Sequence, residues 1–152
     1  MKSKTEQQFE EEPSGPIDLV ELKLRDFIHG KLEAAYGPQF WSDTVPSDIR
    51  VAVEMIDSHI KSHPYDSDKL SSGVHRLSFL DIMDYSKVIL SNWTVFSGVF
   101  QSKSELEKHF LGLKNYRNSV KHRRELNAVE QRVGEAAVLW FHGVLSQVEK
   151  SA

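Results

Sequence analysis

The chain contains no cysteine, which excludes disulfide bonds, thiolate metal ligands, a cysteine nucleophile and thiol redox switching. Long apolar runs are also missing. The longest purely apolar stretch covers the six residues 136–141, whereas a membrane-spanning helix needs about 20. Residues 1–12 lack the apolar segment of a secretory signal peptide. These absences predict a soluble, cytoplasmic protein that has no membrane partner.

A large excess of positive charge is missing as well. The 152 residues include 19 Lys and Arg against 22 Asp and Glu, which gives a formal net charge of −3. A chain of this charge does not bind nucleic acid through its overall electrostatics, so a nucleic-acid site would have to be a local basic segment. The length and the hydrophobic fraction of 39% fit one compact domain.

Several motifs of well-known enzyme classes are absent. The eight glycines form none of the patterns GxGxxG, GxxxxGK(S/T) and GxSxG, so dinucleotide binding, P-loop chemistry and an α/β-hydrolase nucleophile have no support. HExxH is missing too. His59 and His63 are four residues apart, but no third ligand at helical spacing accompanies them, and the end of a solvated helix at Pro64 also accounts for them. We therefore predict neither a metal site nor a cofactor.

The first 16 residues differ in composition from the remainder of the chain. They are polar and end in Pro13-Ser14-Gly15-Pro16, and such a segment cannot bury enough apolar area to offset its loss of conformational entropy. We predict a disordered tail or linker over residues 1–16 and a helical domain over residues 17–150.

Apolar residues recur every three to four positions through most of residues 17–150, which is the period of an amphipathic helix. The pattern predicts a helix from Ile17 to the Gly37-Pro38 stop and a second from Pro46 to Pro64, followed by a loop over residues 63–76. A helical core segment with one break is expected over residues 79–100. Further helices are expected from Ser104, with an interruption at Gly112, and from Asn127, where Glu130 completes an N-terminal capping pattern. No hairpin signal occurs, so the predicted fold class is all-α, a bundle of four or five main helices.

The same periodicity predicts which side chains are buried. The expected seams are Val20, Leu24, Phe27, Ile28, Leu32 and Ala35; Ile49, Val53, Ile56 and Ile60; Leu106, Phe110 and Leu113; and Val129, Val133, Ala136, Ala137, Trp140, Val144 and Val148. Trp93, Phe96, Val133 and Trp140 lie on the strongest apolar stripes, and we expect all four to be core residues.

One segment of the chain is strongly basic. Residues 114–124 include five Lys or Arg and no acid, in a chain that is acidic overall. The polar and aromatic residues of this segment that can contribute to a site are Lys114, Tyr116, Arg117, Asn118, Lys121, His122, Arg123 and Arg124. A concentration of cations in an acidic chain predicts a local site for an anion.

Within the basic segment, Asn118 and His122 are i,i+4 neighbours on a helix, so the Asn amide can orient the imidazole. Arg117 offers planar donors to a phosphate. A titratable imidazole beside a permanent cation suits phosphoryl transfer at RNA, because the imidazole moves a proton while the guanidinium stabilises developing charge. The alternative is a solvated run of charges with a histidine that only packs.

Arg117-Asn118-x3-His122 resembles the Arg-x4-His signature of the HEPN superfamily. The resemblance extends over most of the predicted helical region, through Leu24-Arg-Asp-Phe-Ile28, Ala35-Tyr-Gly37, Trp41, Val45-Pro46, Leu80-Asp81, Asn92-Trp93, Phe100 and Leu113. The order of these segments along the chain resembles one branch of the HEPN superfamily. Domains of this branch are found at the C-terminal end of eukaryotic nuclear mRNA quality-control endonucleases and in bacterial proteins.

The resemblance implies an all-helical HEPN-like bundle that forms a two-fold homodimer, in which two Arg-x4-His motifs meet in one cleft. It also implies a metal-independent endoribonuclease that leaves a 2′,3′-cyclic phosphate and a 5′-hydroxyl. His122 would be the general base or acid, Arg117 would bind the scissile phosphate, and Asn118 would position the histidine.

Other residues of the basic segment would contribute to RNA binding. Lys114, Lys121, Arg123 and Arg124 would attract the RNA backbone by charge. Tyr116 would either stack on a base or pack half-buried against the bundle.

The resemblance leaves a second function open. Many HEPN domains keep the fold without catalysis and serve as dimerisation, RNA-binding or protein-interaction modules of larger RNA-processing or defence systems. The partner of such a module would be a parent ATPase or nuclease. If the chain is instead a ribonuclease that acts as a toxin, its partner would be an antitoxin. The sequence is consistent with both the ribonuclease and the non-catalytic module.

Overall fold

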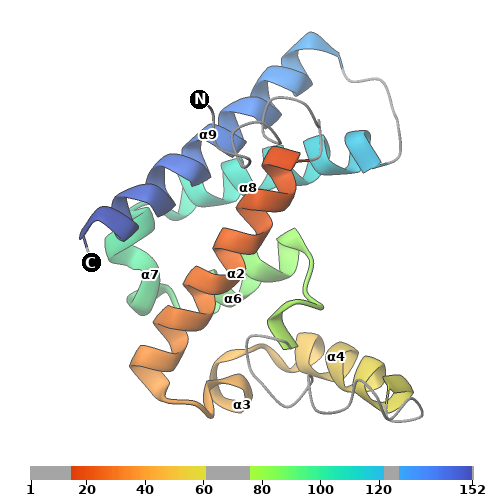
Figure 1. The fold of residues 1–152 in the computed structure, drawn as a ribbon, viewed down its shortest axis with the longest axis vertical. Coiled ribbons are helices and arrows are strands. Elements are labelled where there is room, and N and C mark those ends of the chain that lie inside the picture. Colours follow the sequence, from red (N-terminus) through yellow and green to blue (C-terminus); the bar gives the residue numbers. More distant parts are fainter. Residues whose placement is uncertain (1–14, 61–75, 122–126, 152) are drawn as a thin grey trace, which may run out of the picture. The chain divides into compact units, whose positions relative to one another are not determined.

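The structure is a computed structural model, which describes residues 15–60, 76–121 and 127–151. Seven helices occur in these ranges: α2 (Gly15–Tyr36), α3 (Phe40–Thr44), α4 (Ser47–Ile60), α6 (Ile82–Ser91), α7 (Trp93–Phe100), α8 (Lys103–Lys121) and α9 (Ala128–Ser151) (Figure 1). The described ranges contain no β-strand, so the predicted all-α fold class is confirmed. None of the helices described is long and apolar enough to cross a membrane.

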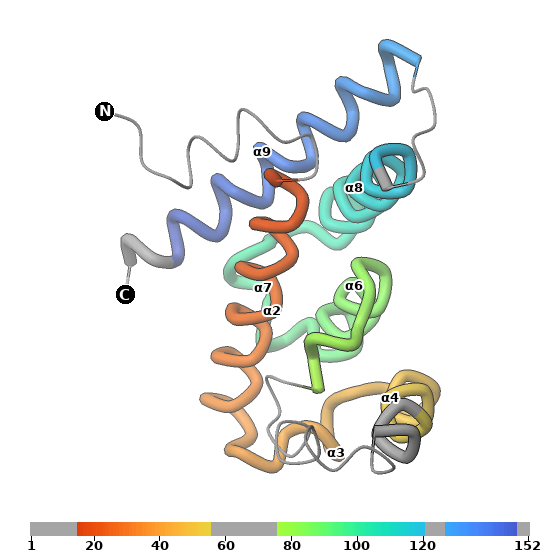
Figure 2. Tube along the Cα trace, turned by 45° about the vertical axis from the view of Figure 1, so that its right-hand side comes forward, coloured from red at the N-terminus to blue at the C-terminus, as the bar shows by residue number. Residues whose placement is uncertain are grey.

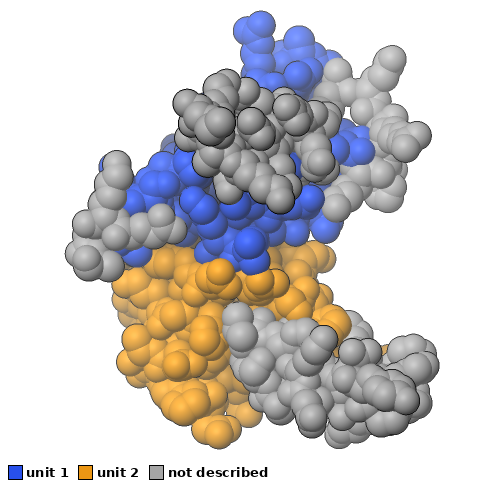
Figure 3. Space-filling view, in the orientation of Figure 1, with its two compact units in different colours: residues 1–24, 102–152 blue, residues 25–101 orange. Residues whose placement is uncertain are grey.

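The chain divides into two compact units (Figure 3). Unit 1 consists of residues 1–24 and 102–152, and its described part holds the beginning of α2 together with α8 and α9. Unit 2 consists of residues 25–101 and holds the remainder of α2 with α3, α4, α6 and α7. Helix α2 therefore belongs to both units.

Helix α2 follows the predicted apolar stripe closely. Val20, Leu24, Ile28 and Leu32 are all buried, which confirms four positions of that seam. Of the other two predicted positions, Phe27 is half-buried and Ala35 is exposed. The helix ends at the predicted stop, where Gly37 adopts a φ of 84° that a residue with a Cβ rarely adopts.

In unit 1, α8 and α9 lie side by side and run in opposite directions (Figures 1 and 2). His109 stacks on Trp140 with ring centroids 4.4 Å apart, and the rings of Phe110 and Phe141 meet edge to face at 4.8 Å. Helix α8 continues through Gly112, so the predicted interruption is wrong. A Cβ at Gly112 would lie 3.1 Å from Cγ1 of Val133, which shows how closely the two helices approach there.

Helix α9 begins as predicted, because Oδ1 of Asn127 accepts a hydrogen bond from the backbone N–H of Glu130 at 2.7 Å. Its buried face differs from the predicted one. Of the predicted positions, Ala137 is buried, Trp140, Val144 and Val148 are half-buried, and Val129, Val133 and Ala136 are exposed. The other buried residues of the helix are Val138, Phe141 and Leu145. The reason is that α9 has apolar residues on two adjacent stripes. The stripe that contains the large Phe141 ring faces α8, and Val133, expected in the core, keeps 45% of its surface exposed.

In unit 2, the core segment contains the single break that was predicted, at Asn92 between α6 and α7. The buried side-chain amide of Asn92 donates to the backbone oxygens of Val88 at 2.8 Å and Thr44 at 2.9 Å, which ties the break to the end of α3. Phe96 is buried as expected, but Trp93 is only half-buried, because it occupies the first position after the break, away from the inward-facing stripe.

The other elements of unit 2 agree with the pattern where they are described. Helix α4 starts directly after Pro46, and Ile49 and Val53 are buried. The side chains of Ile56 and Ile60 lie outside the described part of the chain, as does the predicted loop except for Arg76. Helix α3, a single short turn, was not predicted.

Candidate functional site

The described part of the basic segment forms the C-terminal half of α8. Lys114 is exposed, and Tyr116, Arg117 and Asn118 are each half-buried. The backbone of Lys121 ends the helix. The side chain of Lys121 and the whole of His122, Arg123 and Arg124 lie outside the described residues. The structure therefore locates Arg117 and Asn118 of the motif and leaves the position of its histidine as a prediction.

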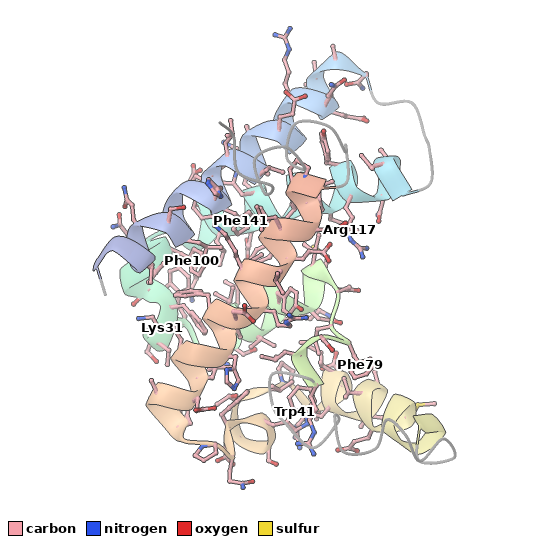
Figure 4. The ribbon with its side chains drawn as sticks, in the orientation of Figure 1. Lys31, Trp41, Phe79, Phe100, Arg117 and Phe141 are labelled. Atoms are coloured by element: carbon pink, nitrogen blue, oxygen red, sulfur yellow. The ribbon has the colours of Figure 1, made fainter. Side chains whose placement is uncertain are left out.

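Arg117 is held by a carboxylate from another helix of unit 1. Figure 4 labels Arg117, which lies on α8. Its Nε forms an ion pair with Oε1 of Glu21 on α2. Both side chains are partly accessible, with 31% of Arg117 and 25% of Glu21 exposed. Because the ion pair involves Nε, it orients the planar guanidinium, whose terminal nitrogens carry the other N–H donors of the fork.

Glu21 was not predicted from the sequence. It follows Val20 on α2 and lies next to the buried stripe, as polar residues of an amphipathic helix commonly do. Nothing in the local spacing points to Arg117, because the two residues are far apart in the chain and only the packing of α2 on α8 brings them together. The sequence shows only that Glu21 is an acidic residue next to the apolar stripe of α2, and that a basic segment occurs elsewhere in the chain.

Asn118 follows Arg117 directly, on the last turn of α8 before Lys121. The i,i+4 relation between Asn118 and His122 was predicted for a continuous helix, and α8 is helical up to the residue before His122. The side chain of Asn118 is half-buried, so it lies at the edge of the helix packing. The hydrogen bond between its amide and the imidazole remains a prediction.

Tyr116 packs against α9. A Cβ at Gly134 would lie 2.0 Å from Cδ2 of the Tyr116 ring, so the ring occupies the space that a side chain at position 134 would take. Burial raises the pKa of the Tyr116 hydroxyl, and the negative charge of Glu135 raises it further. The Tyr116 ring is therefore half-buried against α9, and its hydroxyl stays protonated at neutral pH.

A cavity of about 300 Å³ adjoins Tyr116. Its lining combines apolar side chains, one phenol ring and one carboxylate, contributed by Pro16, Tyr116, Glu135, Val138 and Leu139. The carboxylate of Glu135 is oriented by Gln131, whose side-chain amide donates to Oε1 at 3.0 Å. Neither Glu135 nor the cavity was predicted from the sequence, because an acid on the open face of α9 has no distinguishing local pattern.

Among the described residues, no cluster of three or more His, Asp or Glu side chains could hold a metal ion. The side chain of His59 and all of His63 lie outside the described ranges. No protein-family model, curated protein or solved structure matches the chain. Its function is therefore inferred from the Arg-x4-His motif and from the geometry around Arg117.

Proposed function

We propose that the chain is a HEPN-type, metal-independent endoribonuclease that acts as a homodimer, with Arg117, Asn118 and His122 as its catalytic residues. Two features support this function. The regular elements of the described residues are all helices, and Arg117 and Asn118 of the motif lie in the C-terminal half of a long helix, α8.

The observation that carries the proposal is the ion pair between Arg117 and Glu21. An arginine that only solubilises a surface extends into water, and ordering its long side chain costs conformational entropy. Arg117 instead has its Nε fixed by a carboxylate from α2, while the side chain stays 31% exposed. A guanidinium oriented in this way can present its terminal N–H donors to a phosphate in one geometry, which is what stabilisation of a transition state requires.

In the proposed reaction, His122 of one chain removes the proton from a ribose 2′-hydroxyl. The 2′-oxygen then attacks the adjacent phosphorus, and the bond from phosphorus to the 5′-oxygen breaks. His122 of the second chain protonates the departing 5′-oxygen, so the products are a 2′,3′-cyclic phosphate and a 5′-hydroxyl. Arg117 binds the phosphate as its charge increases, and Asn118 orients the imidazole. The first imidazole starts neutral and gains a proton, and the second starts protonated and loses one, so the two transfers balance.

The proposal requires a two-fold dimer, because a single chain supplies one imidazole for two proton transfers. RNA is the substrate, and Lys114, Lys121, Arg123 and Arg124 attract its backbone. The site of action is the cytoplasm. An antitoxin, or a parent ATPase or nuclease, would control a ribonuclease of this kind in a toxin–antitoxin or phage-defence system.

The test is incubation of the purified chain with a generic single-stranded RNA in EDTA, with analysis of the product ends. The expected result is cleavage that leaves cyclic phosphate and 5′-hydroxyl ends, by a protein that light scattering shows to be a dimer. A protein that binds RNA without cleaving it would favour the non-catalytic module. Cleavage that needs a divalent ion, or a monomer at high concentration, would contradict the proposal.

A further inference from the structure

We propose that the cavity between Tyr116 and Glu135 binds a guanine base of the RNA substrate. The inference rests on the proposed function, since it takes RNA as the ligand, and it adds a base preference that the motif does not imply. Tyr116, which lines the cavity, is the residue directly before Arg117 on α8. A base bound there would be close to a phosphate bound by the motif.

The size and lining of the cavity fit a single flat heterocycle. Its volume of about 300 Å³ is at the lower end of the range for small-molecule sites, ~300–1,000 Å³. Val138 and Leu139 supply apolar surface, and Leu139 is 62% exposed although it is a large apolar side chain. Tyr116 adds an aromatic ring, and stacking of a base on such a ring contributes to binding whichever base it is.

The Tyr116 ring is held in place by the structure. It rests against α9 at Gly134, where the absence of a side chain makes room for it. A ring that is already ordered loses little conformational entropy when a base stacks on it. The glycine therefore does more than allow close packing of the two helices, because it also fixes one wall of the cavity.

Glu135 provides the selectivity. Guanine alone among the four RNA bases presents two neighbouring N–H donors, from N1 and N2, which match the two oxygens of a carboxylate. Adenine, cytosine and uracil each offer a single donor group at the corresponding edge. Gln131 orients the carboxylate through Oε1, and an ionised carboxylate has further acceptor positions on both oxygens.

The charges around the cavity favour a nucleotide over a positively charged peptide side chain. A phenol ring with a carboxylate could also accept an arginine. However, Arg117 directly follows Tyr116 on α8, and the exposed Arg132 lies one turn before Glu135 on α9. These cations repel a cationic ligand and attract the phosphate of a nucleotide. A guanine nucleotide offers N–H donors to the carboxylate and a phosphate to the neighbouring cations.

The test is an NMR titration of the full-length chain with guanosine, adenosine, cytidine and uridine 3′-monophosphates, and with N-acetyl-arginine amide. We expect the guanosine nucleotide to bind at least about tenfold more tightly than the other three. Glu135→Gln should abolish this preference, whereas the matched variant Glu130→Gln on the same helix should retain it. Tyr116→Phe should keep binding, because it keeps the ring.

Equal affinity for the four nucleotides, a preference that survives Glu135→Gln, or tighter binding of the arginine amide would overturn the inference. A parallel cleavage assay separates this failure from failure of the ribonuclease. RNA cleavage that depends on His122 but shows no guanine preference would reject the guanine site and leave the ribonuclease in place. Selective guanine binding without any cleavage would support the guanine site in a non-catalytic RNA-binding module.

Discussion

The guanidinium of Arg117 and the carboxylate of Glu21 form an ion pair that joins the C-terminal half of α8 to the beginning of α2. This contact gives Arg117 a fixed orientation in the described part of unit 1. The orientation matters for the proposed chemistry, because the same guanidinium has to meet a phosphate. In the proposed reaction Glu21 would be a positioning residue, since it would act through Arg117.

Replacing Glu21 should reduce catalysis more than stability. Glu21→Gln removes the charge that orients Arg117, and we expect kcat on single-stranded RNA to fall about ten- to a hundredfold with a small change in KM. Glu21→Asp should recover part of the rate. Asp18→Asn, one turn earlier on the exposed side of α2, is the matched control and should leave kcat unchanged. A lower melting temperature with unchanged kcat would show that the ion pair is purely structural.

Arg117 itself should tolerate no conservative replacement. Arg117→Lys keeps the positive charge but loses the planar fork that Glu21 holds at Nε. We expect Arg117→Lys to recover little of the activity lost in Arg117→Ala, and Asn118→Ala to have a milder effect than either. Single-turnover cleavage rates compare the variants. Full activity in Arg117→Lys would mean that charge alone is sufficient at this position.

Two glycines of α9 should respond oppositely to alanine. At Gly134 a Cβ would lie 2.0 Å from the Tyr116 ring, so Gly134→Ala should destabilise unit 1 by roughly 1–3 kcal/mol. At Gly143 a Cβ would meet nothing within 4 Å, so Gly143→Ala should stabilise the helix by about 0.5–1 kcal/mol. Urea unfolding midpoints measure both. Stabilisation by Gly134→Ala would contradict the close packing of Tyr116 on α9.

Stability should depend on pH through His109. Burial lowers the pKa of His109, and Lys108 lowers it further, although the nearby carboxylate of Glu105 acts in the opposite direction. The unfolded chain therefore binds more protons than the folded chain below the ordinary imidazole pKa of 6.5. The contribution of His109 to stability is present above that value and is lost as the pH falls toward the lowered pKa.

The measurement is a pair of melting curves at about pH 7.5 and about pH 5.5, for the wild-type chain and for His109→Gln. His109 stacks on Trp140, and a neutral glutamine removes the titration while it keeps a polar side chain. The difference in melting temperature between the two pH values should be smaller in the variant. An equal difference in both proteins would show that His109 is not the group responsible.

The fold was largely predictable because its helices are bounded by strong local signals. Gly37, Pro46 and Asn127 end or begin helices where their backbone and side-chain chemistry requires it. The buried face of α9 was not predictable, because its apolar residues form two adjacent stripes and periodicity alone does not choose between Val133 and Phe141. That choice is made by the packing of α8 on α9, which no local pattern contains.

The residues of the candidate site also fall into two groups, those that the sequence predicts and those that only the structure reveals. Arg117 and Asn118 were found because their spacing to His122 is a local pattern on one helix. Glu21, Gly134 and Glu135 were missed because each acquires its role through a residue on another helix. Local spacing therefore identified the residues proposed to carry the chemistry, and only the tertiary structure identified those that position them.

The most direct test of the central claim compares RNA cleavage by the wild-type chain and by His122→Ala, in EDTA, with RNA affinity and helical content measured on the same samples. We expect His122→Ala to lower the rate by about 10²–10⁴-fold, because proton transfer is lost, while affinity and helical content stay close to wild type. His29→Gln, a substitution of another histidine, serves as the control and should cleave normally. Cleavage that persists in His122→Ala would contradict the assignment of the chain as a HEPN-type ribonuclease.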